Sequence, residues 1–61
     1  SSRESQILGL VAEWLANREI AEKLFLSRYT VECHIKHIYR KLAVSSRVRA
    51  VKEARSRGLL A

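Results

Sequence analysis

The sequence predicts an all-α fold, a bundle of four helices within one domain. Three observations support this prediction: apolar residues recur at helical spacing in four stretches, the connections between these stretches are short, and no linker or low-complexity tract separates them. A chain of 61 residues can enclose only a small core. We therefore expect a single domain over residues 1–61 without an internal active-site cavity.

The first helix is predicted to run from Ser1 to Leu15. Ser1 and Glu4 have the spacing of a capping box, in which each side chain accepts a hydrogen bond from the other residue's backbone amide. Apolar residues then recur at helical spacing and form one face for the core. These residues are Ile7, Leu8, Val11, Trp14 and Leu15.

A second, short helix is predicted from a cap at Asn17 to about Leu24, with Ile20, Ala21 and Leu24 facing inward. The next three residues, 25–27, leave room only for a tight turn between two helices. The second helix and the stretch after it therefore form a helix–turn–helix pair.

The third helix is the longest and has two different faces. Ser27 is its expected N-cap, through the amide of Tyr29 or Thr30, and it should end near Ala43. At 100° per residue, one narrow arc is apolar; it contains Val31, Ile35, Ile38 and Leu42, with His34 at its border. The opposite side is polar and mostly cationic; it contains Tyr29, Cys33, Lys36 and Arg40, flanked by Glu32 and His37.

The fourth helix is predicted over about Arg47 to Arg57, with Ser46 as its cap and Gly58 in the left-handed position that ends it. Its apolar positions form a modest stripe of mainly small side chains, which leaves the helix able to pack on a copy of itself. They are Val48, Ala50, Val51 and Ala54, followed by Leu59 and Leu60.

The net charge of +6 is unevenly distributed along the chain. Residues 1–27 hold three Lys or Arg and four Asp or Glu, whereas residues 28–61 hold nine and two. This asymmetry indicates a polyanionic partner, either nucleic acid or an anionic membrane surface. A basic face that serves only solubility is the simpler alternative.

Other classes of function find little support. One cysteine, Cys33, excludes an intrachain disulfide, and no apolar run approaches the roughly 18 residues of a membrane span. No signal-peptide pattern and no initiating Met are present, so we expect a cytoplasmic domain that belongs to a longer protein, with no membrane partner. Cys33, His34 and His37 are too few for a zinc site. We expect no metal, no cofactor, no catalytic residues and no enzymatic activity.

Several stretches of the chain carry a distinctive pattern at fixed spacing. They are Asn17-Arg18-Glu19-Ile20-Ala21-Glu22-Lys23-Leu24, then Ser27-x-x-Thr30-Val31-x-x-His34, and Ile38-Tyr39-Arg40-Lys41-Leu42-x-Val44-Ser45-Ser46-Arg47, with Arg3-Glu4 and Ala50-Val51. Together they resemble the LuxR/FixJ (GerE-type) DNA-binding domain, with the helix-turn-helix over residues 17–36. The ending Ala50-Val51-x-x-Ala54-Arg55-x-x-Gly58-Leu59-Leu60 looks most like the MalT-like branch, whose members are ATP-dependent regulators.

The resemblance implies the output domain of a bacterial transcription regulator, the C-terminal part of a longer chain, that binds double-stranded DNA in a sequence-specific way. The third helix, about 28–42, would enter the major groove, which admits one α-helix. The fourth would form a homodimer on DNA, and RNA polymerase is a further candidate partner. The implied DNA-binding residues are Arg28, Tyr29, Thr30, Glu32, Cys33, Lys36, His37, Arg40 and Arg47, with Arg49 as a further expected phosphate contact; the implied dimer residues are Val48, Val51, Arg55 and Leu59.

Four positions depart from the pattern of that family. Trp14 and Ala43 stand where Gly is usual, at positions suited to positive φ, where a side chain costs about 1 kcal/mol. Ala16 replaces a capping Ser, which shifts the expected cap to Asn17, and Glu32 replaces a usual Lys, which leaves the base preference open. Two alternatives remain: region four of a sigma factor, and a basic helical module that binds proteins or membrane surfaces without reading bases.

Overall fold

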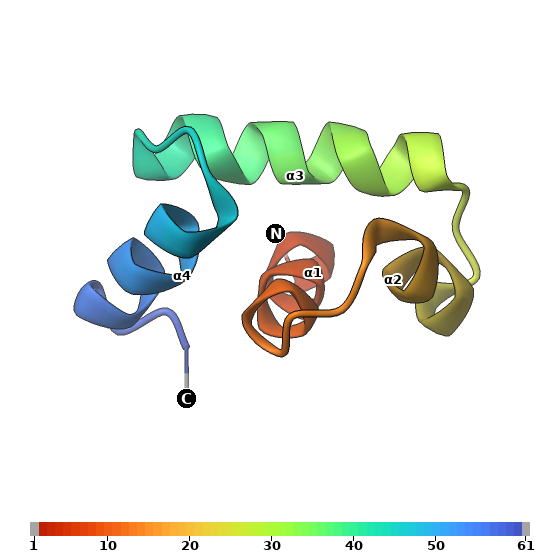
Figure 1. The fold of residues 1–61 in the computed structure, drawn as a ribbon, viewed down its shortest axis with the longest axis horizontal. Coiled ribbons are helices and arrows are strands. Elements are labelled where there is room, and N and C mark those ends of the chain that lie inside the picture. Colours follow the sequence, from red (N-terminus) through yellow and green to blue (C-terminus); the bar gives the residue numbers. More distant parts are fainter. Residues whose placement is uncertain (1, 61) are drawn as a thin grey trace.

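Four helices make up the computed structural model, which describes residues 2–60. They are α1 (Ser2–Ala12), α2 (Asn17–Leu24), α3 (Arg28–Leu42) and α4 (Arg47–Ser56), and the described residues contain no strand. Figure 1 shows α3 lying along one edge of the molecule, with α1, α2 and α4 all packed on the same side of α3. The predicted all-α bundle is confirmed. The predicted capping box of Ser1 lies outside the described residues.

Aliphatic side chains from all four helices fill the core. The apolar arc predicted for the third helix is confirmed in full, because each of its four members is buried. α4 contributes mainly small residues, which lets it pack closely beneath α3. The buried residues are Ile7, Leu8, Val11, Ile20, Ala21, Val31, Ile35, Ile38, Leu42, Ala50, Val51 and Ala54.

α1 ends three residues earlier than predicted. It stops at Ala12, and Trp14 adopts a left-handed backbone with φ 65°. The chain therefore turns before the apolar face can continue, and the side chain of Trp14 is 54% exposed. The prediction that Trp14 belongs to the buried face was wrong, whereas Leu15 does pack against the core.

The start of α2 also differs from the prediction. The N-cap is Ala16, which has no side-chain acceptor, and Asn17 is the first helical residue. The carboxylate of Glu19 accepts a hydrogen bond from the Ala16 backbone amide at 2.9 Å. Glu19 thus supplies one half of a capping box, and the predicted cap at Asn17 was wrong.

The other predicted caps are confirmed. The Ser27 hydroxyl accepts from the Thr30 amide at 3.1 Å, directly after the tight turn of residues 25–27. The Ser46 hydroxyl accepts from the Arg49 amide at 3.3 Å at the start of α4. Both hydroxyls satisfy an amide that has no partner within its own helix.

Each helix ends on a residue with left-handed φ: Trp14, Phe25 and Ala43 at 65°, 57° and 57°, and Gly58 at 71°. Paired backbone hydrogen bonds close each end, as in the bonds from Val44 to Tyr39 and from Ala43 to Arg40 after α3. This pattern is the Schellman motif. Trp14 and Ala43 therefore adopt the left-handed backbone for which glycine is the usual residue.

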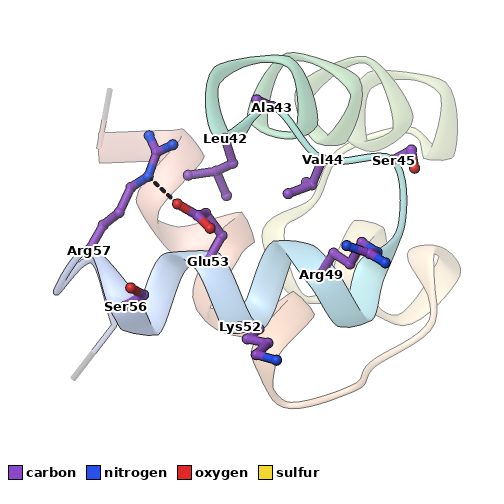
Figure 2. A pocket seen from close by; sticks show the side chains of 9 residues that line it. All are labelled: Leu42, Ala43, Val44, Ser45, Arg49, Lys52, Glu53, Ser56 and Arg57. Carbon is purple, nitrogen blue, oxygen red and sulfur yellow. Dashed lines mark hydrogen bonds and ion pairs between the residues drawn. The ribbon is translucent and has the colours of Figure 1, made fainter.

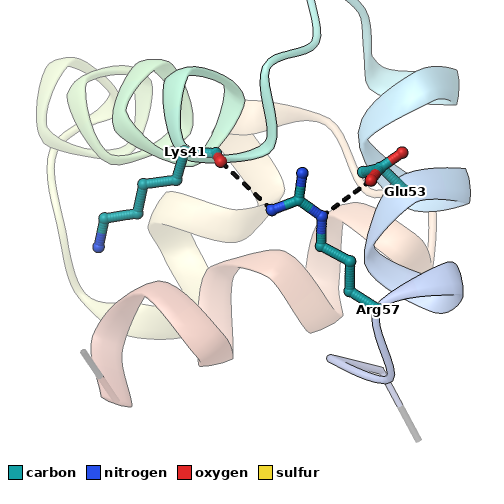
Figure 3. A network of polar contacts seen from close by, with 3 residues as sticks. All are labelled: Lys41, Glu53 and Arg57. Atoms are coloured by element: carbon teal, nitrogen blue, oxygen red, sulfur yellow. Dashed lines mark hydrogen bonds and ion pairs between the residues drawn. The ribbon is translucent and has the colours of Figure 1, made fainter.

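Two ion pairs fasten the ends of helices. Lys41 Nζ lies 2.7 Å from Glu4 Oε1 and joins α3 to α1. Its hydrogen bond and charge lower the pKa of the Glu4 carboxyl. Arg57 bonds Glu53 at 2.8 Å and also donates to the Lys41 carbonyl at 3.5 Å, which ties the residue after α4 to the end of α3 (Figure 3).

None of the helices in residues 2–60 has the length and hydropathy needed to cross a bilayer.

Candidate nucleic-acid interface

The polar side of α3 lies on the outside of the molecule. We call it the outer face of α3 and define it as Tyr29, Glu32, Cys33, Lys36, His37 and Arg40. All of them are exposed except Cys33, which is half-buried. Because the opposite side of the same helix is packed into the core, these side chains are presented on a braced element (Figure 1).

Tyr29 and Cys33 act together at the N-terminal end of this face. They stand one helical turn apart, and a hydrogen bond with Cys33 raises the pKa of Tyr29. The Tyr29 side chain is 75% exposed, so the ring is available to a partner.

The first turn of α3 presents groups suited to an anion. Arg28 is exposed. The Thr30 hydroxyl accepts a hydrogen bond from the Ser27 hydroxyl at 2.9 Å, which leaves the proton of the Thr30 hydroxyl to donate elsewhere. The positive end of the helix dipole adds to the attraction.

A hollow of about 480 Å³ beside the start of α2 gathers three arginines from three helices. Arg18 comes from α2, Arg28 from α3 and Arg47 from α4, and the backbone at Ala16 and Asn17 completes the lining. The sequence did not single out Arg18 for binding. Its contribution depends on the packing of α2 against α3, which the chain order does not reveal.

Arg47 differs from the exposed phosphate contact that was expected. One terminal guanidinium nitrogen, Nη2, donates to the carbonyl of Leu15, and the guanidinium carbon lies 5.8 Å from the centroid of the Trp14 ring. Its Nε is buried and has no hydrogen-bond partner among the described residues. The side chain is thus held within the domain by the loop between α1 and α2.

His34 lies at the boundary of the core, as predicted, and is half-buried. Its Nδ1 is buried without a hydrogen-bond partner in the described part of the chain. The residues of α3 around it point mainly apolar groups inward.

Three of the four predicted dimer residues lie on the surface, Val48 and Arg55 on α4 and Leu59 after its end. Val48 and Leu59 are 64% and 55% exposed, and Arg55 is exposed. Val51 is the exception, because it is buried in the domain's own core and cannot meet a second copy directly. The role of these four residues in a dimer stays a prediction.

The corner between α3 and α4 forms a larger open hollow of about 880 Å³ (Figure 2). Its cations are Arg49, Lys52 and Arg57, of which Arg57 is paired with Glu53. Figure 2 shows Lys52 on the side of α4 that points away from α3. The cations of α4 are therefore spread over a surface separate from the outer face of α3.

Comparison with known proteins identifies relatives of this domain. The chain matches the family of bacterial regulatory proteins called the luxR family over residues 1–54. It is 48% identical over 60 residues to the oxygen regulatory protein NreC of Staphylococcus aureus, and the matched region covers 98% of this chain and 28% of NreC. It is 47% identical over 58 residues to the HTH-type transcriptional regulator AlkS of Alcanivorax borkumensis, covering 95% of this chain and 7% of AlkS.

A solved structure shows the same fold. The response regulator ChrA of a heme-sensing two-component system superimposes with a TM-score of 0.94 at 46% sequence identity, over 97% of this chain and 29% of ChrA. The chain thus spans less than a third of each of these three proteins. On the match over residues 1–54, the chain belongs to the luxR family of bacterial regulatory proteins.

Proposed function

We propose that this domain binds DNA in a sequence-specific way as the output domain of a bacterial transcription regulator, with α3 in the major groove. The observation that carries the proposal is the two-sided construction of α3, whose buried ridge braces an exposed polar outer face. The major groove accepts one α-helix and displays a distinct pattern of donors and acceptors for each base pair.

Three side chains in the middle of the outer face would read bases. Lys36 can donate to guanine O6 and N7, and Glu32 can accept from cytosine N4. Cys33 is small enough to contact a thymine methyl group. Glu32 and Lys36 lie one turn apart and have opposite charge, so they favour different bases at neighbouring positions.

The cations and donors around that centre would bind phosphates. Arg28 and Thr30 lie at the N-terminus of α3, where free amides and the helix dipole favour an anion. Tyr29, His37 and Arg40 extend the contact along the helix. Phosphate contacts fix the register of the domain on the duplex, while base contacts determine specificity.

Dimerisation on DNA would use α4, through Val48, Arg55 and Leu59. Val48 on α4 and Leu59 after it are exposed apolar side chains, and the buried residues of α4 are small, which supports this assignment. The intact regulator would be a longer, cytoplasmic protein in which other domains control dimerisation and RNA polymerase is a candidate partner. Membership of the MalT-like branch stays a prediction.

Anisotropy of a labelled duplex, recovered from a random pool by the wild-type chain, tests groove reading. Lys36→Ala removes one cation from the outer face of α3, and Lys52→Ala removes one from the far side of α4 (Figure 2). We expect Lys36→Ala to raise Kd about tenfold, since a base contact contributes about 1–3 kcal/mol, and to change the selected sequence. Lys52→Ala should leave both nearly unchanged.

Equal effects of the two substitutions would contradict the proposal, because net charge alone would then explain binding. Anionic phospholipid vesicles that compete as well as DNA would favour a membrane-surface module instead.

A further inference from the structure

Arg47 connects two helices that do not otherwise meet. In residues 2–60, α2 packs on α1 and α3, and α4 packs on the same two helices, but α2 and α4 make no contact of their own. Arg47 is the first residue of α4, and its guanidinium reaches the loop from which α2 departs. This side chain is a direct link between α4 and the entrance to the helix-turn-helix.

Two contacts hold the guanidinium against that loop. Nη2 donates to the carbonyl of Leu15, the residue directly before the N-cap Ala16. The guanidinium carbon stands 5.8 Å from the centroid of the Trp14 ring, within the range of a cation–π interaction. The guanidinium of Arg47 therefore contacts two successive residues of the loop, Trp14 and Leu15.

Backbone hydrogen bonds from Trp14 to Val11 and from Leu15 to Leu10 also hold the loop, but the Trp14 side chain has little packing of its own. Trp14 adopts a left-handed backbone that disfavours a side chain, and its ring is more than half exposed and so is not anchored in the core. Leu15 packs against the core, but its carbonyl points to Arg47. The contacts of Arg47 with Trp14 and Leu15 form a clamp and therefore add to what holds the loop from which α2 departs.

We propose that Arg47 is a positioning residue for DNA recognition, which sets α2 and the outer face of α3 at a fixed orientation to α4. This inference rests on the proposed function. In a dimer formed through α4, that orientation determines the separation of the two reading helices, and half-site spacing on DNA follows from it. A phosphate ligand needs only positive charge at this position. A positioning residue needs the planar fork of arginine and the Trp14 ring.

Arg47→Lys separates these two roles, because it keeps the charge and removes the fork. On the duplex recovered by the wild-type chain, we expect Arg47→Lys to raise Kd about tenfold, nearly as much as Arg47→Ala, since a lost charged hydrogen bond contributes about 1.5–3 kcal/mol. The slope of log Kd against log salt should stay that of the wild type. Wild-type binding by Arg47→Lys, or an Arg47→Ala slope smaller by about 0.9, would identify a phosphate ligand instead.

Trp14→Ala provides the second arm, because it removes the ring without changing charge and keeps a side chain at the left-handed position. We expect a loss similar to that of Arg47→Lys and no further loss in the double variant, since both substitutions release one clamp. Wild-type binding by Trp14→Ala, or losses that add, would overturn the proposal.

Folding is monitored in the same variants by amide hydrogen exchange. Faster exchange confined to the loop of residues 13–16, with α3 protected as in the wild type, is expected of a released clamp. Faster exchange throughout the domain would overturn the positioning role in favour of a general loss of stability. A wild-type chain that selects no duplex from the pool would overturn the proposed function itself.

Discussion

Three residues with side chains adopt the left-handed backbone that glycine adopts at no cost: Trp14, Phe25 and Ala43. Each pays about 1 kcal/mol for this conformation. Trp14 makes a contact with Arg47 from its position, whereas the side chain of Phe25 is 95% exposed and Ala43 is exposed as well. The C-terminal ends of α1, α2 and α3 are therefore set by tertiary packing and paired backbone hydrogen bonds, and not by the local preference of the residue.

Ala43→Gly should stabilise the domain by about 0.5–1 kcal/mol. The substitution relieves the left-handed strain at the end of α3, and Ala43 is exposed, so little packing is lost. Gln6→Gly, on the exposed side of α1, is the matched control and should destabilise by about 1 kcal/mol, because glycine is unfavourable within a helix. Urea unfolding measures both; a destabilising Ala43→Gly would mean that the end of α3 is not strained.

At the scale of the helices, periodicity predicted the core well and the helix ends less well. The arc of α3 could be predicted because burial repeats every 3.6 residues, and Ser27 and Ser46 because a hydroxyl before a helix has a local target. Trp14 continues the apolar spacing of α1, so nothing local indicates that the chain turns there. The role of Arg47 depends on a carbonyl 32 residues away. Contacts of this kind arise from the packing of helices and have no signature in the order of residues.

The ion pair between Lys41 and Glu4 should make the packing of α3 on α1 sensitive to acid. The pKa of Glu4 is lowered in the folded domain, so its stabilising contribution is fully present above its ordinary value of 4.5 and is lost as pH falls through the folded pKa. We expect Glu4→Gln to lower the melting temperature at pH 7 and to have a smaller effect at pH 3.

Glu13→Gln is the control for the pH series, because Glu13 is exposed and forms no ion pair among the described residues. Glu13→Gln should leave the melting temperature nearly unchanged at pH 7 and at pH 3. A difference between Glu4→Gln and wild type that grows toward pH 3 would contradict the assignment.

The whole molecule carries its positive charge on two surfaces with opposite consequences. On the outer face of α3 the cations favour DNA. Salt weakens that binding, because the release of counterions from DNA becomes less favourable as the salt concentration rises. On α4, Arg55 lies on the same helix as the exposed apolar residue Val48, and the exposed Leu59 follows shortly after that helix ends. A two-fold axis that passes through α4 close to Arg55 would bring this guanidinium near that of the second chain, because an isologous contact pairs a surface with itself.

Salt should therefore act in opposite directions on the two associations of this domain. We expect the isolated chain to be monomeric at about 50 mM salt, where the Debye length exceeds about 10 Å and the cations repel one another. At about 1 M salt the Debye length falls to about 3 Å, and the chain should self-associate measurably.

Sedimentation equilibrium measures the self-association, and anisotropy measures the loss of DNA binding over the same range of salt. Arg55→Ala removes the repulsion and should raise self-association at low salt, whereas Leu59→Ala should reduce self-association at high salt. A wild-type dimer that weakens as salt rises would show that α4 associates through ion pairs and not through its apolar residues.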